Sequence, residues 1–154
     1  MKALIVYLSF HHKNTEKIAK VFSKVLNAQI IDLLKFRDVS KLNIFDYDLI
    51  GFGSGIYFGK HHRKLLEFVD SLPINKMKVF IFSTCGINFK LFNHYAIRKK
   101  LKQKHFEILG EFSCKGYDTY GFLKLIGGIN KNHPNEEDIR RAEEFAKKLK
   151  EMFN

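Results

Sequence analysis

The chain has 154 residues, of which 45% are hydrophobic and 28% are charged. This length and composition are typical of one packed globular domain. They exclude a disordered tail, a collagen-like repeat and a small disulfide-stapled peptide, so we expect a single domain over residues 1–154. Two cysteines indicate a reducing compartment. The charge is unusual, because 27 Lys and Arg against 16 Asp and Glu give a net charge of +11. Such a surface attracts nucleic acid, anionic membranes or acidic proteins.

The first apolar stretch, residues 3–8, is followed by polar residues without a small-residue cleavage site. It is too short for the core of a signal peptide or for a membrane span. We therefore predict a strand here, and a cytoplasmic protein with no membrane-spanning segment.

Short apolar segments then alternate with segments of helical period. Apolar residues at 18, 21, 22, 25 and 26 predict a helix that begins at Asn14 or Thr15. Strands are predicted at 29–34 and 47–53, followed by a helix around 65–72. A fourth strand at 77–83 precedes a basic helix at 89–104, and a fifth strand at 106–114 precedes a last helix that begins at 134–135. In the basic helix we expect four residues to face inward: Leu91, Tyr95, Ile97 and Leu101.

Strands that are apolar on both faces and separated by helices predict a parallel sheet covered on both sides. We therefore predict an α/β fold with a doubly wound, five-stranded parallel sheet. Ligands of such folds bind beyond the carboxyl ends of the strands. The loops after strands one, three, four and five are thus the candidate sites.

The first of these loops, residues 9–15, joins strand one to the first helix. It combines hydroxyl groups, an amide, a Lys and the free N–H groups of a helix start, all of which suit an anion. The alternative is a plain capping turn. Because the loop contains no glycine, it is not a GxGxxG nucleotide loop.

The loop after strand three, residues 53–60, contains three glycines and two adjacent aromatic residues. Its Gly59–Lys60 pair suggests a Walker A motif, but His61 replaces the Ser or Thr that would hold Mg²⁺, so we exclude a nucleoside-triphosphate site. Glycines allow the backbone to approach a flat ligand closely, and aromatic rings at a cleft mouth would stack on it. The alternative is that both rings are packed, which we favour for Phe58.

Two further loops place small and polar residues at the same edge of the sheet. Cys85, in the loop after strand four, has no base beside it in the sequence, so we expect it to lie next to a ligand rather than act as a nucleophile. Residues 116–121 are expected to form the far wall of the cleft, and Cys114 to lie in the core.

The adjacent histidine pairs at 11–12 and 61–62 have no flanking carboxylate, so we expect no metal site.

Taken together, these segments resemble the flavodoxins over nearly the whole chain. The resemblance is carried by residues 4–9 with 14–19, 53–58, 83–86, and 127–129 with 133–138. It implies the strand order 2-1-3-4-5 and a non-covalently bound FMN. Lys13 stands where the family's phosphate loop has a glycine, and with no Trp in the chain Tyr57 would stack on the flavin. Most flavodoxins that carry electrons are strongly acidic, whereas this chain is basic.

The resemblance also implies which residues contact FMN. The phosphate would lie in the first loop and the isoalloxazine between the loops after strands three and four, with no catalytic residue of the protein itself. The expected contacts are Ser9, His11, His12, Lys13, Asn14, Thr15, Ser54, Gly55, Ile56, Tyr57, Phe58, Thr84, Cys85, Gly86, Asn88, Tyr117 and Asp118.

The predicted function is therefore electron transfer on FMN between redox partner proteins, by a monomer whose partners have an acidic docking surface. One alternative is an FMN-dependent oxidoreductase similar to quinone or protoporphyrinogen reductases. This chain has little length for the substrate pocket that such an enzyme needs.

The other alternative is a flavin-free basic regulatory or nucleic-acid-binding domain, based on the basic residues at 60–64 and 98–104. Charge runs of this kind are usually solvated helix faces and give only salt-sensitive binding without sequence specificity, so we expect no specific nucleic acid.

Overall fold

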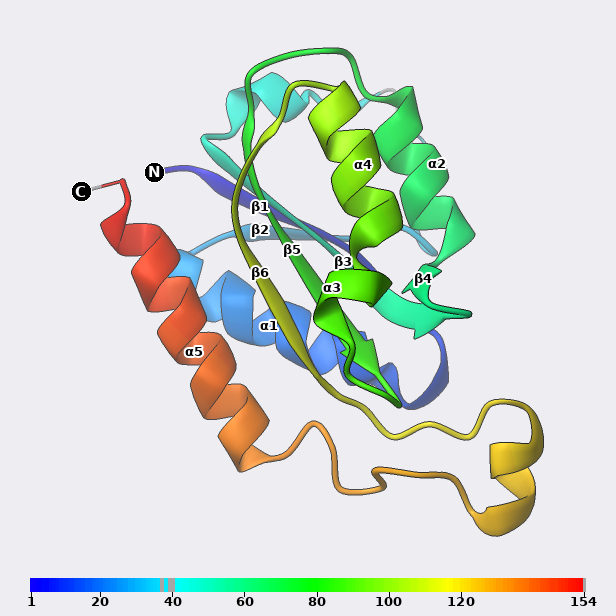
Figure 1. Cartoon of the computed structure of the whole chain (residues 1–154). Coiled ribbons are helices and arrows are strands. Elements are labelled where there is room, and N and C mark those ends of the chain that lie inside the picture. The colour runs from blue at the N-terminus through cyan, green and yellow to red at the C-terminus, as the bar shows by residue number, and fades with distance from the viewer. Residues whose placement is uncertain (37, 39–40, 154) are drawn as a thin grey trace.

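A twisted parallel sheet forms the centre of the fold (Figure 1). The computed structural model describes residues 1–36, 38 and 41–153. The five long strands are β1 (Ala3–Leu8), β2 (Gln29–Asp32), β3 (Leu49–Tyr57), β5 (Lys78–Cys85) and β6 (Glu107–Lys115). They lie in the order β2-β1-β3-β5-β6, and every neighbouring pair is parallel. The predicted five-stranded sheet and its order are confirmed. The short β4 (Lys60–His61), which the sequence did not predict, pairs antiparallel with the end of β3.

Helices cover both faces of this sheet. α1 (Asn14–Leu26) and α5 (Glu136–Glu151) pack on one face, and α2 (Arg63–Ser71) and α4 (Tyr95–Gln103) on the other (Figure 1). α3 (Lys90–Asn93) precedes α4, and there are short 3₁₀ turns at η1 (His11–Lys13), η3 (Ile44–Asp46) and η4 (Gly121–Ile126). η4 lies in the middle of the long connection from β6 to α5, at the point where this connection stands farthest from the sheet (Figure 1). Among the described residues, no helix is long and apolar enough to cross a membrane.

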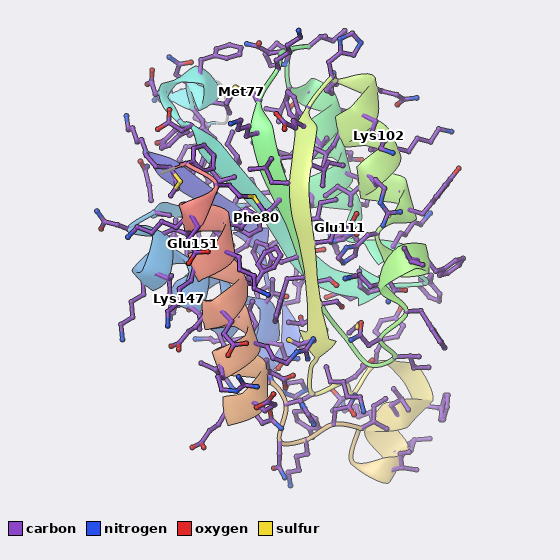
Figure 2. The ribbon with its side chains drawn as sticks, turned by 60° about the vertical axis from the view of Figure 1, so that its left-hand side comes forward. Met77, Phe80, Lys102, Glu111, Lys147 and Glu151 are labelled. Carbon is purple, nitrogen blue, oxygen red and sulfur yellow. The ribbon has the colours of Figure 1, made fainter. Side chains whose placement is uncertain are left out.

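Aromatic side chains fill the space between the sheet and the α1–α5 layer. The ring of Phe22 is fully buried and meets the rings of Phe80 and Phe82 edge-on, at centroid distances of 5.2 and 5.1 Å. Phe80, which lies on the α5 side of the sheet in Figure 2, also packs against Phe145 of that helix. Edge-to-face contacts of this kind add to the free energy gained from burial, and they attach both helices to β5.

β3 is longer than predicted, because residues 54–57, expected as part of a loop, continue it. Gly53 is the register partner of Phe82, and a Cβ on Gly53 would lie 2.2 Å from the Phe82 ring. Its missing side chain therefore makes room for a core residue rather than for a ligand. The chain turns at Phe58 and Gly59, whose positive φ angles of 50° and 75° are typical of a two-residue hairpin. Phe58 is 85% exposed, so the expectation that it is packed is wrong: at the tip of this hairpin its ring faces away from the core.

The predicted helix at 89–104 is divided into α3 and α4, which meet at His94. Ile97 and Leu101 are buried as predicted, but Leu91 and Tyr95 are 79% and 63% exposed. Their predicted inward position is wrong, because the break between the two helices turns His94 inward instead, where it is fully buried. Cys114 lies in the core as predicted.

Candidate cofactor-binding cleft

A cleft lies at the carboxyl ends of β1, β3, β5 and β6, where the chain order of the strands reverses beside β1. This is the position at which doubly wound sheets bind their ligands. The structure brings most of the predicted residues together there; His12, Lys13, Ser54 and Asn88 do not line the cleft. Four lining residues were not among the predicted contacts: Gly116, Thr119 and Tyr120, which lie in the predicted far wall, and Phe10 of the first loop.

The first loop enters α1 through an unusual backbone turn. His12 and Lys13 have φ angles of 57° and 53°, a left-handed conformation that residues with a side chain rarely adopt. Lys13 thus takes a conformation that suits a glycine. The family whose phosphate loop this segment resembles has a glycine at this position. Each such residue costs about 1–3 kcal/mol and needs surrounding contacts to hold it. His12 supplies one, because its Nε2 lies 2.8 Å from the hydroxyl of Thr119 and its ring 4.0 Å from that of Tyr117.

Asn14 and Thr15 form the floor of the cleft at the start of α1. The side-chain amide of Asn14 donates to the carbonyl oxygen of Tyr117 over 2.8 Å, whereas its Oδ1 is buried without a hydrogen-bond partner. The buried hydroxyl of Thr15 lies 2.8 Å from that of Thr84, which joins the start of α1 to the end of β5. Gly116 makes this floor possible, since a Cβ there would lie 2.8 Å from the Asn14 amide nitrogen.

Aromatic rings surround the mouth of the cleft. The half-buried ring of Tyr57 meets the ring of His62 edge-on at a centroid distance of 5.3 Å, and the ring of Phe10 also contacts His62, at 4.8 Å. Tyr120 stands edge-on to both Tyr57 and Phe58, at 6.3 and 5.8 Å. Burial, and then the charge of Asp118, raise the pKa of Tyr57, so its phenol is neutral at physiological pH. The cleft therefore has an uncharged aromatic side.

Cys85 lines the cleft at the end of β5, and its thiol is buried against β6. Its sulfur is 3.6 Å from the Ser113 hydroxyl and 3.5 Å from the Cys114 carbonyl oxygen. Burial raises the pKa of this thiol. A protonated thiol is a poor nucleophile, so Cys85 is suited to contact a ligand rather than to attack one.

Three of the predicted residues outside the cleft have other positions in the fold. The Ser54 hydroxyl donates to the Gly55 carbonyl oxygen over 2.7 Å and accepts from the His62 amide over 3.0 Å, which braces the β3–β4 hairpin. Asn88 is exposed beyond the end of β5, and Lys13 is exposed in the left-handed turn.

Residues 4–125 match the family model of the flavodoxin domain. The chain belongs to the flavodoxin family. It is 60% identical over 150 residues to an uncharacterized protein of Methanocaldococcus jannaschii, a match that covers 97% of this chain and 98% of that relative.

Solved structures share the fold of this flavodoxin at low sequence identity. Flavodoxin 2 from Bacillus cereus superimposes with a TM-score of 0.70 at 19% identity and covers 99% of both chains. A flavodoxin from the domain Archaea gives 0.63 at 15% identity, over 95% of this chain and 94% of the other. The flavodiiron protein of Giardia intestinalis gives 0.69 at 15% identity; the match covers 94% of this flavodoxin but only 34% of that longer chain.

Behind the cleft, this flavodoxin contains a buried polar network that the sequence did not reveal. Nε2 of His94 lies 2.7 Å from the Ser83 hydroxyl, and its Nδ1 lies 2.9 Å from Glu111, which extends from β6 toward α4 (Figure 2). Arg98 binds both oxygens of Glu111, each over 2.7 Å. The order Ser–His–Glu is that of a hydrolase triad, but Ser83 and His94 are 0% exposed, so the hydroxyl is closed to substrates. The network instead ties β5, α4 and β6 together beneath the cleft.

Two pKa shifts describe the charge state of this network. Burial raises the pKa of Glu111, but its hydrogen bonds with His94 and Arg98 outweigh this and lower it to about 2. Burial lowers the pKa of His94, so the imidazole is neutral and its Nδ1–H donates to an ionised Glu111. Nε2 then accepts from the Ser83 hydroxyl.

Proposed function

We propose that this flavodoxin carries electrons on a non-covalently bound FMN between redox partner proteins. Its membership in the family supports a flavin, and the cleft supports FMN. When bound, FMN supplies one- and two-electron redox chemistry, which is a property of the cofactor, while the protein positions it and controls access to it. The observation that carries the proposal is the buried, unpartnered Oδ1 of Asn14 in the floor of the cleft.

The polar floor fits the phosphate and the ribityl chain. The first turn of α1 has free N–H groups and a partial positive charge, both of which favour a phosphate, and the Thr15 hydroxyl lies beside them. A buried acceptor without a partner is costly. A ribityl hydroxyl donating to the Asn14 Oδ1 would remove that cost, which a simple capping turn does not explain.

The apolar side of the cleft fits the flat ring system. Tyr57 presents a neutral ring on one side, and Cys85 with Gly86 presents small groups on the other. Tyr57 and Phe10 would hold the ring by contact and exclude water from its inner edge. The hydrogen bonds of Ser54 and His62 hold the Tyr57 hairpin in position.

The proposal is tested by titrating the cofactor-free protein with FMN, riboflavin and FAD and following flavin fluorescence. We expect FMN to bind more tightly than riboflavin, which lacks the phosphate. Asn14→Asp places a negative charge in the floor and is expected to weaken FMN binding by about tenfold, or ~1.4 kcal/mol, and riboflavin binding less.

Asn27→Asp at the other end of α1 is the matched control and is expected to leave both affinities unchanged. Absence of FMN binding, or equal losses for FMN and riboflavin in the Asn14 variant, would contradict the proposed site. Steady NAD(P)H-driven quinone turnover by the purified protein alone would indicate the stand-alone oxidoreductase instead.

The net charge of +11 supports the acidic partner. Opposite charge accelerates association, and salt screens it. We expect electron transfer from the photoreduced protein to an acidic ferredoxin to slow steeply as ionic strength rises in a stopped-flow experiment. A basic cytochrome c is the control, for which the rate should rise with salt. If the electron-transfer rates to the two proteins are equal and do not change with salt, charge does not select the partner.

A further inference from the structure

The end of the molecule that carries the cleft mouth has a rim of exposed apolar side chains. We define this apolar rim as Phe58, Leu91, Phe92, Phe122, Leu125 and Ile126, which are between 66% and 88% exposed. The rim connects three separate segments. Phe58 contacts Tyr120 next to η4, and Phe92 of α3 lies so close to Gly59 that a Cβ there would be 2.3 Å from its ring. Exposed apolar side chains that gather on neighbouring segments and are rimmed by polar residues mark an interaction site.

η4 is the most prominent part of the rim. Its sequence, Gly-Phe-Leu-Lys-Leu-Ile, is followed by two further glycines, and a Cβ added to Gly121 or Gly127 would meet no atom within 4 Å. The turn is nevertheless held at its base, because the Tyr117 hydroxyl donates to the Gly127 carbonyl oxygen over 3.0 Å and the Gly128 N–H donates to the Leu123 carbonyl oxygen over 2.7 Å. It is thus an apolar tip that projects from the body in a defined conformation (Figure 1).

The charges around the rim are positive. Lys60, Lys90, Lys115, Lys124 and Lys131 are all exposed on the segments that form or adjoin it. Between residues 86 and 132 the sequence has only three carboxylates: Glu107, Glu111 and Asp118. Glu107 begins β6 at the opposite end of the sheet, Glu111 is bound by Arg98, and Asp118 lines the cleft. The exposed lysines around the rim therefore outnumber the one carboxylate of residues 86–132 near it, Asp118, which bonds the Tyr120 amide beside η4.

The residue types favour lipid over protein as the partner. Protein interfaces are rich in aromatic residues, Met and Arg but poor in Lys, and Leu is rare among their hot spots, so it is the lysines and leucines of the rim that favour lipid. The η4 tip consists of Phe, Leu and Ile around a Lys, whose long side chain can reach a headgroup while its stem lies among apolar groups. A second copy of this chain is disfavoured because both copies carry a net charge of +11.

We propose that the apolar rim docks on an anionic lipid bilayer, with the η4 side chains in the interfacial region and the surrounding lysines against lipid phosphates. The combination of protruding apolar side chains and flanking cations is that of peripheral membrane binding. Docking in this way places the mouth of the cleft at the membrane surface. The proposal goes beyond electron transfer on FMN and does not depend on it.

The test is flotation of the purified protein with vesicles of phosphatidylcholine containing increasing fractions of phosphatidylglycerol, with and without FMN. We expect binding to rise with phosphatidylglycerol and to fall with salt. A Leu125→Ser/Ile126→Ser variant is expected to bind about tenfold more weakly, since apolar burial drives insertion. Ile74→Ser is the matched control, because Ile74 is 65% exposed on the α2–β5 connection, outside the rim, and should bind like the parent.

Circular dichroism checks that both variants remain folded, and a Phe122→Ser variant provides a second measurement. The proposal is overturned if the parent does not float with anionic vesicles, if neutral vesicles bind it equally well, or if the rim variants bind like Ile74→Ser. It is also overturned if ultracentrifugation shows a dimer that the Leu125→Ser/Ile126→Ser variant abolishes, which would assign the rim to a second copy. If the protein binds anionic vesicles but does not bind FMN, the proposed membrane docking is supported and the proposed cofactor is contradicted.

Discussion

Gly53 is a position at which a single methyl group decides the packing between two strands. An added Cβ would lie 2.2 Å from the ring of Phe82, in a core without space to move that ring. Overpacking of this kind costs about 1–3 kcal/mol. We therefore expect Gly53→Ala to lower the free energy of unfolding in urea by about that amount. Gly55→Ala is the control, because its Cβ would be 3.3 Å from Tyr57 at the open cleft. Equal losses at the two glycines would contradict this account.

Glu111 predicts how stability depends on pH. Its pKa is about 2 in the folded protein against an ordinary value of 4.5, so the ionised carboxylate stabilises the fold above pH 4.5 and this contribution is lost as the pH falls toward 2. We expect Glu111→Gln to be less stable than the parent at pH 7, and the difference to narrow between pH 4.5 and pH 2. Urea unfolding across this range measures it. Glu151→Gln, at the exposed end of α5, is the control. A gap between Glu111→Gln and the parent that does not change with pH would refute the assignment.

At the scale of the elements, the start of α5 shows how local sequence determines a boundary. The Asn135 side chain accepts from the Asp138 amide, and the Asp138 carboxylate accepts from the Asn135 amide, each over 3.0 Å. This capping box satisfies N–H groups that would otherwise lack partners. We expect Asn135→Ala to lower the free energy of unfolding by about 1 kcal/mol. Asn132→Ala, at an exposed residue of the preceding turn, should have little effect, and a comparable loss there would argue against the cap.

The elements also show where prediction from sequence ends. Strands that are buried on both faces and helices with one apolar face carry their pattern in consecutive residues, so the sheet and its covering helices could be predicted. The break at His94 could not, because it depends on Ser83 and Glu111, which reach His94 from β5 and β6. The continuation of β3 through residues 54–57 was missed for a similar reason: the glycines at 53, 55 and 59 are typical of a loop, whereas Ser54 and Gly55 continue the pairing with Ser83 and Thr84 of β5.

At the scale of the whole molecule, the position of the cleft follows from the doubly wound parallel sheet, which the alternation of apolar strands and helices predicted before the resemblance supplied the strand order. All four cleft loops were therefore identified in advance. The sequence did not reveal which side chains of these loops face the cleft and which face elsewhere. His12 faces Thr119 rather than the cleft, and Phe58 projects into solvent, because each conformation depends on contacts between segments that are distant in the chain.

The joining of the first and last cleft loops has a consequence for the energetics of the whole chain. His12 contacts Thr119 and Asn14 contacts Tyr117, across 107 and 103 residues of sequence. A ligand that orders residues 9–15 must therefore also reduce local unfolding of the connection that carries η4. Amide hydrogens at Asp118 and Ile129, which bond each other's carbonyl oxygens, should exchange more slowly with solvent deuterium once the cleft is filled. Binding of a ligand in the cleft would then reduce the local unfolding of the connection that carries η4.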